Sequence, residues 1–271
     1  MIKISNKEFE MFSDYIRENY GIYLKEEKKT LVINRLYNEF VNSNCKTLKQ
    51  YLEYILSDKS GEALNILINK ITTNYTFFMR EAEHFYFFRD KVLPYLLSTV
   101  KDKDLRIWSA GCSTGQEPYT IAMIIDDYLK EDKKLWDTKI LATDISSKVL
   151  NEAMEGIYSK DQIKLLPSQW RLSYFKRIDN ENYMIVDNIK KEVIFRKFNL
   201  MNKVFPFRKK FHVIFCRNVM IYFDSKTRTE LINKFYDILE YGGYLFIGLT
   251  ESIQRNESKF QYVMPSVYRK I

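Results

Sequence analysis

The stretch Leu105-Arg-Ile-Trp-Ser-Ala-Gly-Cys-Ser-Thr-Gly-Gln-Glu-Pro118 joins a short apolar run to a helical pattern through a turn that contains two glycines. A glycine-rich turn between a strand and a helix lets backbone N–H groups approach a ligand, and Pro118 suits the first turn of a helix. The turn lacks the Lys-Ser/Thr of a phosphate-binding loop and the Gly-x-Gly-x-x-Gly spacing of a dinucleotide fingerprint. Taken alone, it is equally consistent with a ligand-binding turn and with a tight turn that needs glycine for its backbone angles.

Outward from this turn, short apolar runs alternate with helical patterns. Further runs lie at 139–144, 192–200, 211–218 and 242–250, and apolar residues at helical spacing mark 117–130, 147–155 and 226–240. Alternation of strand and helix predicts a parallel sheet covered by helices, which is the α/β class. Residues 158–192 interrupt the alternation, and their polar stretch predicts a hairpin inserted between the second and third strands of the sheet.

The first seventy residues carry apolar positions at helical spacing instead. One stripe consists of Ile33, Leu36, Tyr37, Phe40 and Val41, and a second consists of Leu48, Tyr51, Leu52, Ile55 and Leu56. Ser5-x-x-Glu8 and Thr47-x-x-Gln50 are typical of helix starts. These patterns predict a small helical bundle with charged outer faces.

Composition excludes several classes of protein. The chain has 271 residues, of which 46% are hydrophobic and 29% charged, as in globular proteins that are not membrane-embedded. No run reaches the roughly twenty apolar residues of a membrane span, and the first residues lack a signal-peptide pattern, so we expect a cytoplasmic protein. Scattered Cys45, Cys112 and Cys216 predict reduced thiols. Because His84 and His212 lie far apart and no Cys-x-x-Cys occurs, no metal site is expected.

Net charge is +8, and the basic excess lies after residue 155. Such an excess can attract an acidic protein, a nucleic acid or an anionic surface, and by itself it does not distinguish between them. His84 and His212 are interpreted as surface or packing residues and not as acids or bases.

Asp144 ends the second predicted strand, 29 residues after Gly115. A carboxylate at the end of the second strand is where nucleoside-binding sheets hold the ribose hydroxyls. The alternative is a helix N-cap, because Asp144-Ile-Ser-Ser precedes a helical stretch. The turn and this carboxylate together favour a ligand that contains adenosine.

Polar groups also gather at 74–80 and 216–223. The first segment interleaves Asn74, Thr76 and Arg80 with aromatic residues, and the guanidinium of Arg80 is suited to a carboxylate partner. We expect Phe77 and Phe78 to pack at an interface. The second segment follows the fourth strand, where ligands of open α/β sheets bind. Cys112 and Cys216 are interpreted as small buried residues.

Six segments in order resemble those of the chemotaxis receptor glutamate methyltransferases, the CheR family: NYTFFMR, WSAGCSTGQEPYTIAM, ATDIS, FNL, FHVIFCRNVMIYFD and GGYLFIGLTES. The match extends over essentially the whole chain. The resemblance implies a small N-terminal helical domain (1–72) and a Rossmann-like S-adenosylmethionine-dependent methyltransferase domain (73–271) with an antiparallel β-subdomain inserted at about 158–192. It implies methylation of glutamate side chains on the cytoplasmic helical domain of chemoreceptors.

The resemblance also implies the site residues. Contacts to S-adenosylmethionine, or to its product S-adenosylhomocysteine, are expected from Asn74, Thr76, Arg80, Gly111, Gly115, Glu117, Asp144, Asn199, Leu200, Arg217 and Asn218. Tyr222 is expected near the transferred methyl group. A glutamate carboxylate is already ionised at neutral pH and needs no general base. We therefore expect Arg80 and Tyr222 to act by orienting the substrate carboxylate, and no metal to take part.

One departure from the family concerns receptor docking. Some members bind a receptor's C-terminal pentapeptide through a longer, glycine-containing loop of the β-subdomain, whereas the turn here, 178–183, is short and has no glycine. We expect pentapeptide-independent recognition by a monomer. Lys25, Lys28, Lys29 and Arg35 are candidates for a receptor-binding face, and a solvated helix end explains them equally well.

Two other functions are compatible with parts of the sequence. Methylation of RNA or of a small molecule would fit the basic C-terminal region, but the fourth strand ends in RNVMIY and not in the Asn/Asp-Pro-Pro-aromatic motif of many base-amino methyltransferases. A catalytically silent module that senses the cofactor would lack one or more site positions, and none is missing. The resemblance favours the receptor methyltransferase, without nucleic-acid binding or membrane insertion.

Overall fold

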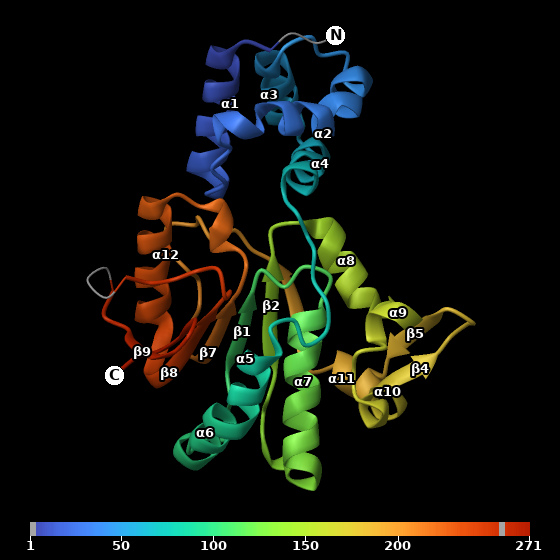
Figure 1. Ribbon diagram of the computed structural model, residues 1–271, viewed down its shortest axis with the longest axis vertical. Helices are drawn as coiled ribbons and strands as arrows, with labels where there is room; N and C mark the ends of the chain where they lie inside the picture. Colours follow the sequence, from blue (N-terminus) through green and yellow to red (C-terminus); the bar gives the residue numbers. More distant parts are fainter. Residues whose placement is uncertain (1–3, 255–257) are drawn as a thin grey trace. The chain divides into compact units, whose positions relative to one another are not determined.

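The computed structural model describes residues 4–254 and 258–271 and divides the chain into two compact units (Figure 1). The helical unit runs to Thr73 and also takes in Asn199–Lys203 and Tyr222–Arg228. The sheet unit consists of Asn74–Phe198, Val204–Ile221 and Thr229–Ile271.

The helical unit is built from the helices α1 (Asn6–Tyr20), α2 (Lys29–Asn42), α3 (Leu48–Ser57) and α4 (Glu62–Ile71), with a 3-10 turn η1 (Glu26–Lys28) before α2. Ser5 and Glu8 form the predicted capping box, in which each side chain accepts the other residue's backbone N–H. At the start of α3, Thr47 Oγ1 accepts the Gln50 N–H, while the Gln50 side chain accepts the Lys46 N–H, one residue earlier than in a capping box.

The buried faces of α2 and α3 are narrower than the sequence pattern predicts. α2 buries Val32, Leu36 and Phe40, a row at a spacing of four residues, and leaves Tyr37 and Val41 half exposed. α3 buries Leu48, Tyr51 and Ile55, while Leu56 is 59% exposed. The apolar stripe of each helix is therefore wider than its buried face, because the seam of this small bundle admits about one apolar row per helix.

The sheet unit contains a mostly parallel sheet, which confirms the predicted α/β class. Its strands are β1 (Ile107–Ala110), β2 (Ile140–Asp144), β6 (Val193–Lys197), β7 (Phe211–Cys216), β8 (Leu239–Ile247), β9 (Gln261–Met264) and β10 (Val267–Arg269). Within the described residues their order is β6-β2-β1-β7-β8-β10-β9. The five strands β6, β2, β1, β7 and β8 are parallel, and β10 pairs with β8 antiparallel.

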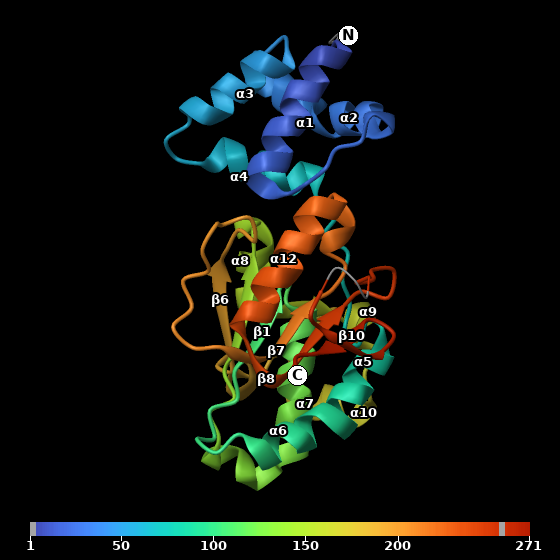
Figure 2. The same ribbon diagram turned by 90° about the vertical axis from the view of Figure 1, so that its left-hand side faces the viewer.

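Helices cover both faces of this sheet. α12 (Ser225–Ile238) packs against one face (Figures 1 and 2). The other face carries α5 (Ala82–Phe87), the π-helical segment η2 (Phe88–Val92), α6 (Leu93–Thr99), α7 (Gln116–Leu129) and α8 (Ser147–Glu155). The 3-10 segment η3 (Lys130–Leu135) follows α7. Side chains alternate along a strand, so Trp108 of β1 faces α12, where its ring lies 5.5 Å from that of Phe235. Phe215 of β7 faces the opposite side, against Phe85 and Phe88.

The insertion forms a small antiparallel sheet in the order β3 (Ile157–Ser159), β5 (Asn182–Ile185), β4 (Phe175–Arg177), together with short helices α9 (Lys160–Ile163), α10 (Ser168–Tyr174) and α11 (Asp187–Lys190). The hairpin turn contains no glycine and is stabilised by hydrogen bonds of its side chains. Asp179 accepts the backbone N–H groups of Glu181 and Asn182, and Arg177 Nε donates to the Asp179 carbonyl. In the part of the chain described here, no helix combines the length and the apolar composition that a membrane crossing requires.

Candidate functional site

The candidate site lies at the carboxyl edge of the parallel strands of the sheet unit. The glycine turn follows β1, Asp144 ends β2, Arg217 and Asn218 follow β7, and Gly248 follows β8. Loops at the carboxyl ends of parallel strands meet at one edge, and ligands of open α/β sheets bind there. The topology therefore brings together segments that are up to 168 residues apart, as for Glu81 and Leu249.

Both glycines of the turn are required by backbone conformation and by packing. Gly111 has φ +100° and Gly115 has φ +91°, which other residues rarely adopt. A Cβ at Gly111 would collide with the Val219 side chain, and one at Gly115 would lie 2.9 Å from the Ala153 Cβ. The tight-turn interpretation thus explains both glycines, and a contact of either with a ligand stays a prediction.

Strained backbone gathers around this edge. Met79, Glu81, Ser113 and Asn218 all have φ between +49° and +60°, the left-handed region, although none is glycine. Each such residue costs about 1–3 kcal/mol and persists only where surrounding contacts impose it. Residues of this kind cluster at active sites and ligand clamps.

Asp144 fastens the glycine turn to the end of β2. One carboxylate oxygen accepts the Ser113 N–H at 2.9 Å, and the other accepts the Ser146 N–H at 2.9 Å. Burial raises the pKa of this carboxyl, and the backbone N–H groups oppose that rise. The N-cap of α8 is Ser146, whose Oγ accepts the Val149 N–H, so the alternative interpretation of Asp144 as the cap is wrong.

The segment from Asn74 to Glu81, here called the strap, is tied to the sheet at several points. Ser113 Oγ donates to the Asn74 carbonyl at 2.9 Å, and the ring of Phe78 is buried 4.8 Å from that of Tyr158. Phe78 therefore packs against the inserted subdomain, as an interface residue, while Phe77 is half-buried beside Tyr75. Thr76 is half-buried.

Arg80 is the least constrained charge of the strap. Its Nη1 donates to the Tyr75 carbonyl at 2.6 Å, and its guanidinium lies 5.8 Å from the Tyr75 ring centre. Among the described residues, no carboxylate pairs with it. The guanidinium is thus available to an anion from outside the chain.

Arg217 is the centre of a buried polar network. Its side chain is 2% exposed. Nη1 donates to Glu117 at 2.9 Å, Nη2 donates to Glu81 at 3.0 Å and to the Arg80 carbonyl, and Nε donates to His84 Nδ1 at 3.1 Å. One guanidinium N–H is left without a partner among the described residues.

Glu117, like Arg217, is held by hydrogen bonds within the chain. Besides Arg217, it accepts a hydrogen bond of 2.7 Å from Ser109 Oγ, so both of its oxygens are engaged. Contacts of Glu117 and Arg217 with a cofactor stay predictions. Their observed bonds fix the first turn of α7 to the end of β7.

His84 was interpreted as a surface or packing residue, and it is fully buried in this network. Because Nδ1 accepts from Arg217, the proton of the neutral ring lies on Nε2, which faces the Pro265 carbonyl at 3.4 Å. Burial, together with the positive charge of Arg217, lowers the pKa of His84 to about 4. The side chain is therefore a neutral acceptor that orients Arg217.

Two carboxylates of the site were missed by sequence reasoning. Glu81 joins the strap to Arg217 and Asn218, and Glu251 accepts the backbone N–H groups of Asn218, Ile221 and Gly248 at 2.6–3.0 Å. Burial raises the pKa of Glu251, and these N–H groups oppose the rise. The sequence signal was the carboxylate in the GLTES segment that follows β8, which the resemblance contained but did not single out.

Asn199, Leu200 and Tyr222 belong to the helical unit. Asn199 Nδ2 donates to the Asn19 carbonyl and its Oδ1 accepts the Met201 N–H, while Leu200 is 9% exposed. The Tyr222 hydroxyl donates to the Thr73 carbonyl at 3.1 Å. Their contacts with a cofactor or substrate stay predictions.

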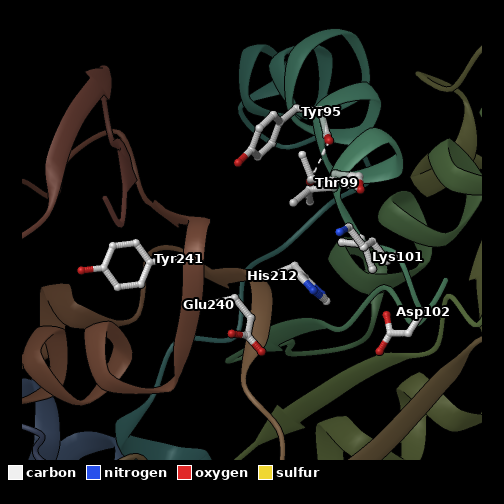
Figure 3. A pocket seen from close by; sticks show the side chains of 9 residues that line it. Tyr95, Thr99, Lys101, Asp102, His212, Glu240 and Tyr241 are labelled. Atoms are coloured by element: carbon white, nitrogen blue, oxygen red, sulfur yellow. Dashed lines mark hydrogen bonds between the residues drawn. The ribbon is translucent and has the colours of Figure 1, made fainter.

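The opposite, amino-terminal edge of the sheet has a hollow of about 340 Å³ (Figure 3). It is lined by Tyr95, Leu96, Thr99, Val100, Lys101, Asp102, His212, Glu240 and Tyr241. Both acidic residues of its lining, Asp102 and Glu240, pair with Arg106, which also contacts Asp104 and whose backbone N–H donates to His212 Nδ1. Across residues 4–254 and 258–271, His, Cys, Asp and Glu side chains nowhere gather in threes as a metal site would need.

The chain matches two models of one protein family. Residues 74–268 match the model described as "CheR methyltransferase, SAM binding domain", and residues 7–72 match "CheR methyltransferase, all-alpha domain". The chain is 43% identical to a chemotaxis protein methyltransferase of Borreliella burgdorferi, over 99% of this chain and 96% of that one. It is 33% identical to chemotaxis protein methyltransferase 2 of Vibrio cholerae (96% and 90%) and 34% identical to the chemotaxis protein methyltransferase of Escherichia coli (98% and 92%).

His84 gives a pH-dependence that can be measured. Because its folded pKa lies below the unfolded value of about 6.5, the unfolded chain binds the extra proton, and the stabilisation present above pH 6.5 is lost as pH falls towards 4. We expect this residue to account for about 2 kcal/mol of the unfolding free energy lost between pH 8 and pH 5.

Urea unfolding at a series of pH values should therefore show a shallower acid decline for His84→Gln than for the unaltered chain. His212→Gln is the companion variant: burial and Arg106 also lower the pKa of His212, which lies outside the Arg217 network, so it too should show a shallower decline. A His84→Gln profile parallel to that of the unaltered chain would contradict the assignment of a neutral, buried His84.

Proposed function

The chain belongs to the CheR methyltransferase family, and from this premise and the geometry of its site we propose that it methylates glutamate side chains of bacterial chemoreceptors. The methyl group comes from S-adenosylmethionine, and the products are a glutamate methyl ester and S-adenosylhomocysteine. The observation that carries the proposal is Asp144, a half-buried carboxylate at the end of β2 that is hydrogen-bonded to the glycine turn inside the matched S-adenosylmethionine-binding domain.

The residues present fit such a cofactor. Both Asp144 oxygens accept backbone N–H groups, and a carboxylate oxygen can accept two hydrogen bonds, so acceptor capacity remains for a ribose hydroxyl. We assign the remaining contacts to Asn74, Thr76, Gly111, Gly115, Glu117, Asn199, Leu200, Arg217 and Asn218, with the domain boundary between residues 72 and 73. No metal is assigned a role.

Methyl transfer to a carboxylate depends mainly on alignment of the two reactants. When bound, S-adenosylmethionine supplies a methyl group on a sulfonium centre, which is already an activated leaving group. The incoming glutamate is ionised at neutral pH, so the chain has no proton to remove. Holding two reactants in line can lower a barrier by about 7–11 kcal/mol in favourable cases.

Arg80 and Tyr222 are the residues we assign to this alignment. Arg80 carries a guanidinium that no carboxylate among the described residues neutralises, and guanidinium matches carboxylate in two parallel hydrogen bonds. The Tyr222 hydroxyl would orient the attacking oxygen. Both act on the substrate by position and charge, without transferring a proton.

Receptor recognition is assigned to the helical unit and not to the hairpin of the inserted subdomain. Lys25 and Lys28 are exposed, and α2 leaves Leu31, Tyr37 and Val41 about half exposed. This mixture of basic and apolar side chains suits an acidic amphipathic helix. The hairpin turn, which Asp179 caps, is too short to supply a docking loop, so we propose recognition by a cytoplasmic monomer that does not depend on a receptor's C-terminal pentapeptide.

Label transfer tests the reaction. The chain is incubated with methyl-tritiated S-adenosylmethionine and a cytoplasmic fragment of a chemoreceptor, and the labelled fragment is then treated with mild base. We expect the label to be released as methanol, because a carboxyl methyl ester hydrolyses in base. Label that resists base would mean methylation at nitrogen or carbon, and no transfer by protein that binds S-adenosylhomocysteine would favour a silent binding module.

Two substitutions should separate alignment from cofactor binding. Tyr222→Phe removes one hydroxyl, and we expect a lower turnover with nearly unchanged affinity for S-adenosylhomocysteine. Asp144→Asn is the contrasting variant: one acceptor oxygen becomes a donor, and we expect affinity to fall about tenfold or more, the cost of a lost hydrogen bond to a charged group. Calorimetry measures the affinity and initial rates measure the turnover of each variant. An unchanged rate for Tyr222→Phe would contradict the role of Tyr222. An unchanged affinity for Asp144→Asn would contradict the role of Asp144.

A further inference from the structure

The carboxylate of Glu81 joins three segments of the sheet unit. Its Oε2 accepts from Arg217 Nη2 at 3.0 Å and from the Leu249 N–H at 3.3 Å, and its Oε1 accepts from Asn218 Nδ2 at 3.1 Å. Burial opposes the charged form, but Arg217 and the donated hydrogen bonds outweigh it and lower the pKa of Glu81. An ionised acceptor thus ties the end of the strap to the ends of β7 and β8.

These contacts set which way the Asn218 amide faces. Glu81 Oε1 has no hydrogen, so the Asn218 group that approaches it must be the NH2 donor. Among the described residues, no donor reaches the other half of that amide, Oδ1. Asn218 therefore keeps an acceptor for a ligand, in a backbone conformation, φ +60°, that Asn and Asp tolerate better than other residues.

Contacts with Gly248 and Glu251 restrict the backbone of Asn218. A Cβ added to Gly248 would lie 2.6 Å from Asn218 Nδ2 and 2.8 Å from its backbone N, so the glycine is in close contact with it. Glu251 accepts the Asn218 backbone N–H at 3.0 Å. With its main chain held in this way, the remaining freedom of Asn218 is rotation of its side-chain amide.

Arg80 depends on the same carboxylate. Arg217 Nη2 donates both to the Arg80 carbonyl and to Glu81, the next residue along the chain. The strained backbone at Met79 and Glu81 flanks Arg80 on each side. Release of the Glu81 side chain would free the end of the strap that carries Arg80.

We propose that Glu81 is a positioning residue of the methyl-transfer site, which orients the Asn218 amide with its acceptor towards the cofactor and holds Arg80 at the edge of the site. The inference rests on the proposed function, because that function assigns Arg80 and Asn218 to cofactor and substrate. Glu81 itself touches neither.

Glu81→Gln makes a specific prediction. A glutamine keeps its oxygen towards Arg217 and Leu249, which places its NH2 where Oε1 met Asn218. Two NH2 groups would then face each other, so the Asn218 amide turns over and presents a donor to the ligand in place of an acceptor. We expect the dissociation constant of S-adenosylhomocysteine to rise about tenfold or more.

Exchanging the pair tests this role against a merely structural one. Asn218→Asp alone sets two carboxylates against each other and should also weaken binding. The double variant, Glu81→Gln with Asn218→Asp, again pairs an NH2 group with a carboxylate and again leaves an acceptor for the ligand. We expect its dissociation constant to return to within about threefold of that of the unaltered chain, a coupling that independent sites do not show.

The measurement is calorimetric titration with S-adenosylhomocysteine, with thermal unfolding of each variant in parallel. Glu83→Gln is the matched control, since Glu83 lies two residues away and is exposed, and it should leave affinity unchanged. A double variant that binds as weakly as the two singles combined, or a Glu81→Gln variant with unaltered affinity, overturns the proposal. Should Glu81→Gln not fold, recovery of folding and binding in the double variant supports the proposal, and its failure to fold overturns it.

The same titration separates this inference from the function on which it rests. An unaltered chain that does not bind S-adenosylhomocysteine contradicts the proposed function. An unaltered chain that binds, with no rescue in the double variant, contradicts the role of Glu81 alone.

Discussion

A guanidinium that is almost wholly buried at the end of β7 is the constraint on which the site depends. Arg217 cannot be left unpaired there, because an isolated charge in such a place costs several kcal/mol. Its partners come from the strap (Glu81 and the Arg80 carbonyl), from α5 (His84) and from the first turn of α7 (Glu117). Satisfying one side chain therefore fixes the relative positions of three segments at the carboxyl edge of the sheet.

The surroundings of Arg217 also set the charge of this edge. Glu81, Glu117 and Asp144 supply carboxylates, and His84 is held neutral by burial, so the described acidic groups outnumber Arg217 and Arg80. An edge with this balance favours a ligand that carries positive charge. The sulfonium of S-adenosylmethionine is such a ligand, and loss of that charge on methyl transfer would weaken the attraction for the product.

Much of the fold was predictable, because the apolar runs of β1, β2, β6, β7 and β8 and the helices between them follow their own local patterns. Less could be predicted where short elements depend on distant partners. Residues 82–99 form α5, η2 and α6 with a change of helical pitch in the middle, and β9 and β10 extend the sheet as an antiparallel hairpin; neither was predicted. In α2 the apolar stripe is wider than the buried face, since Tyr37 and Val41 are exposed.

Within the site, the sequence indicated which residues lie at the ends of strands, but not which distant residues they bond to. Asp144 could be singled out because it ends β2 at a set distance from the glycine turn, and both its bonds lie close by in the fold. Glu81, His84 and Glu251 have partners 30 to 168 residues away, so no local pattern marks them. For His84 the interpretation as a packing residue agrees with its burial, but no local pattern marks its hydrogen bond to Arg217.

A crystal structure of the chain with S-adenosylhomocysteine would show directly what Asp144 and Arg217 contact when the ligand is bound. We expect the ribose hydroxyls to lie within hydrogen-bond distance of Asp144, and Arg217 to keep its bonds to Glu81, Glu117 and His84 beside the ligand. A ligand seated elsewhere, or an Arg217 that leaves both glutamates to bind the ligand's carboxylate, would contradict this expectation.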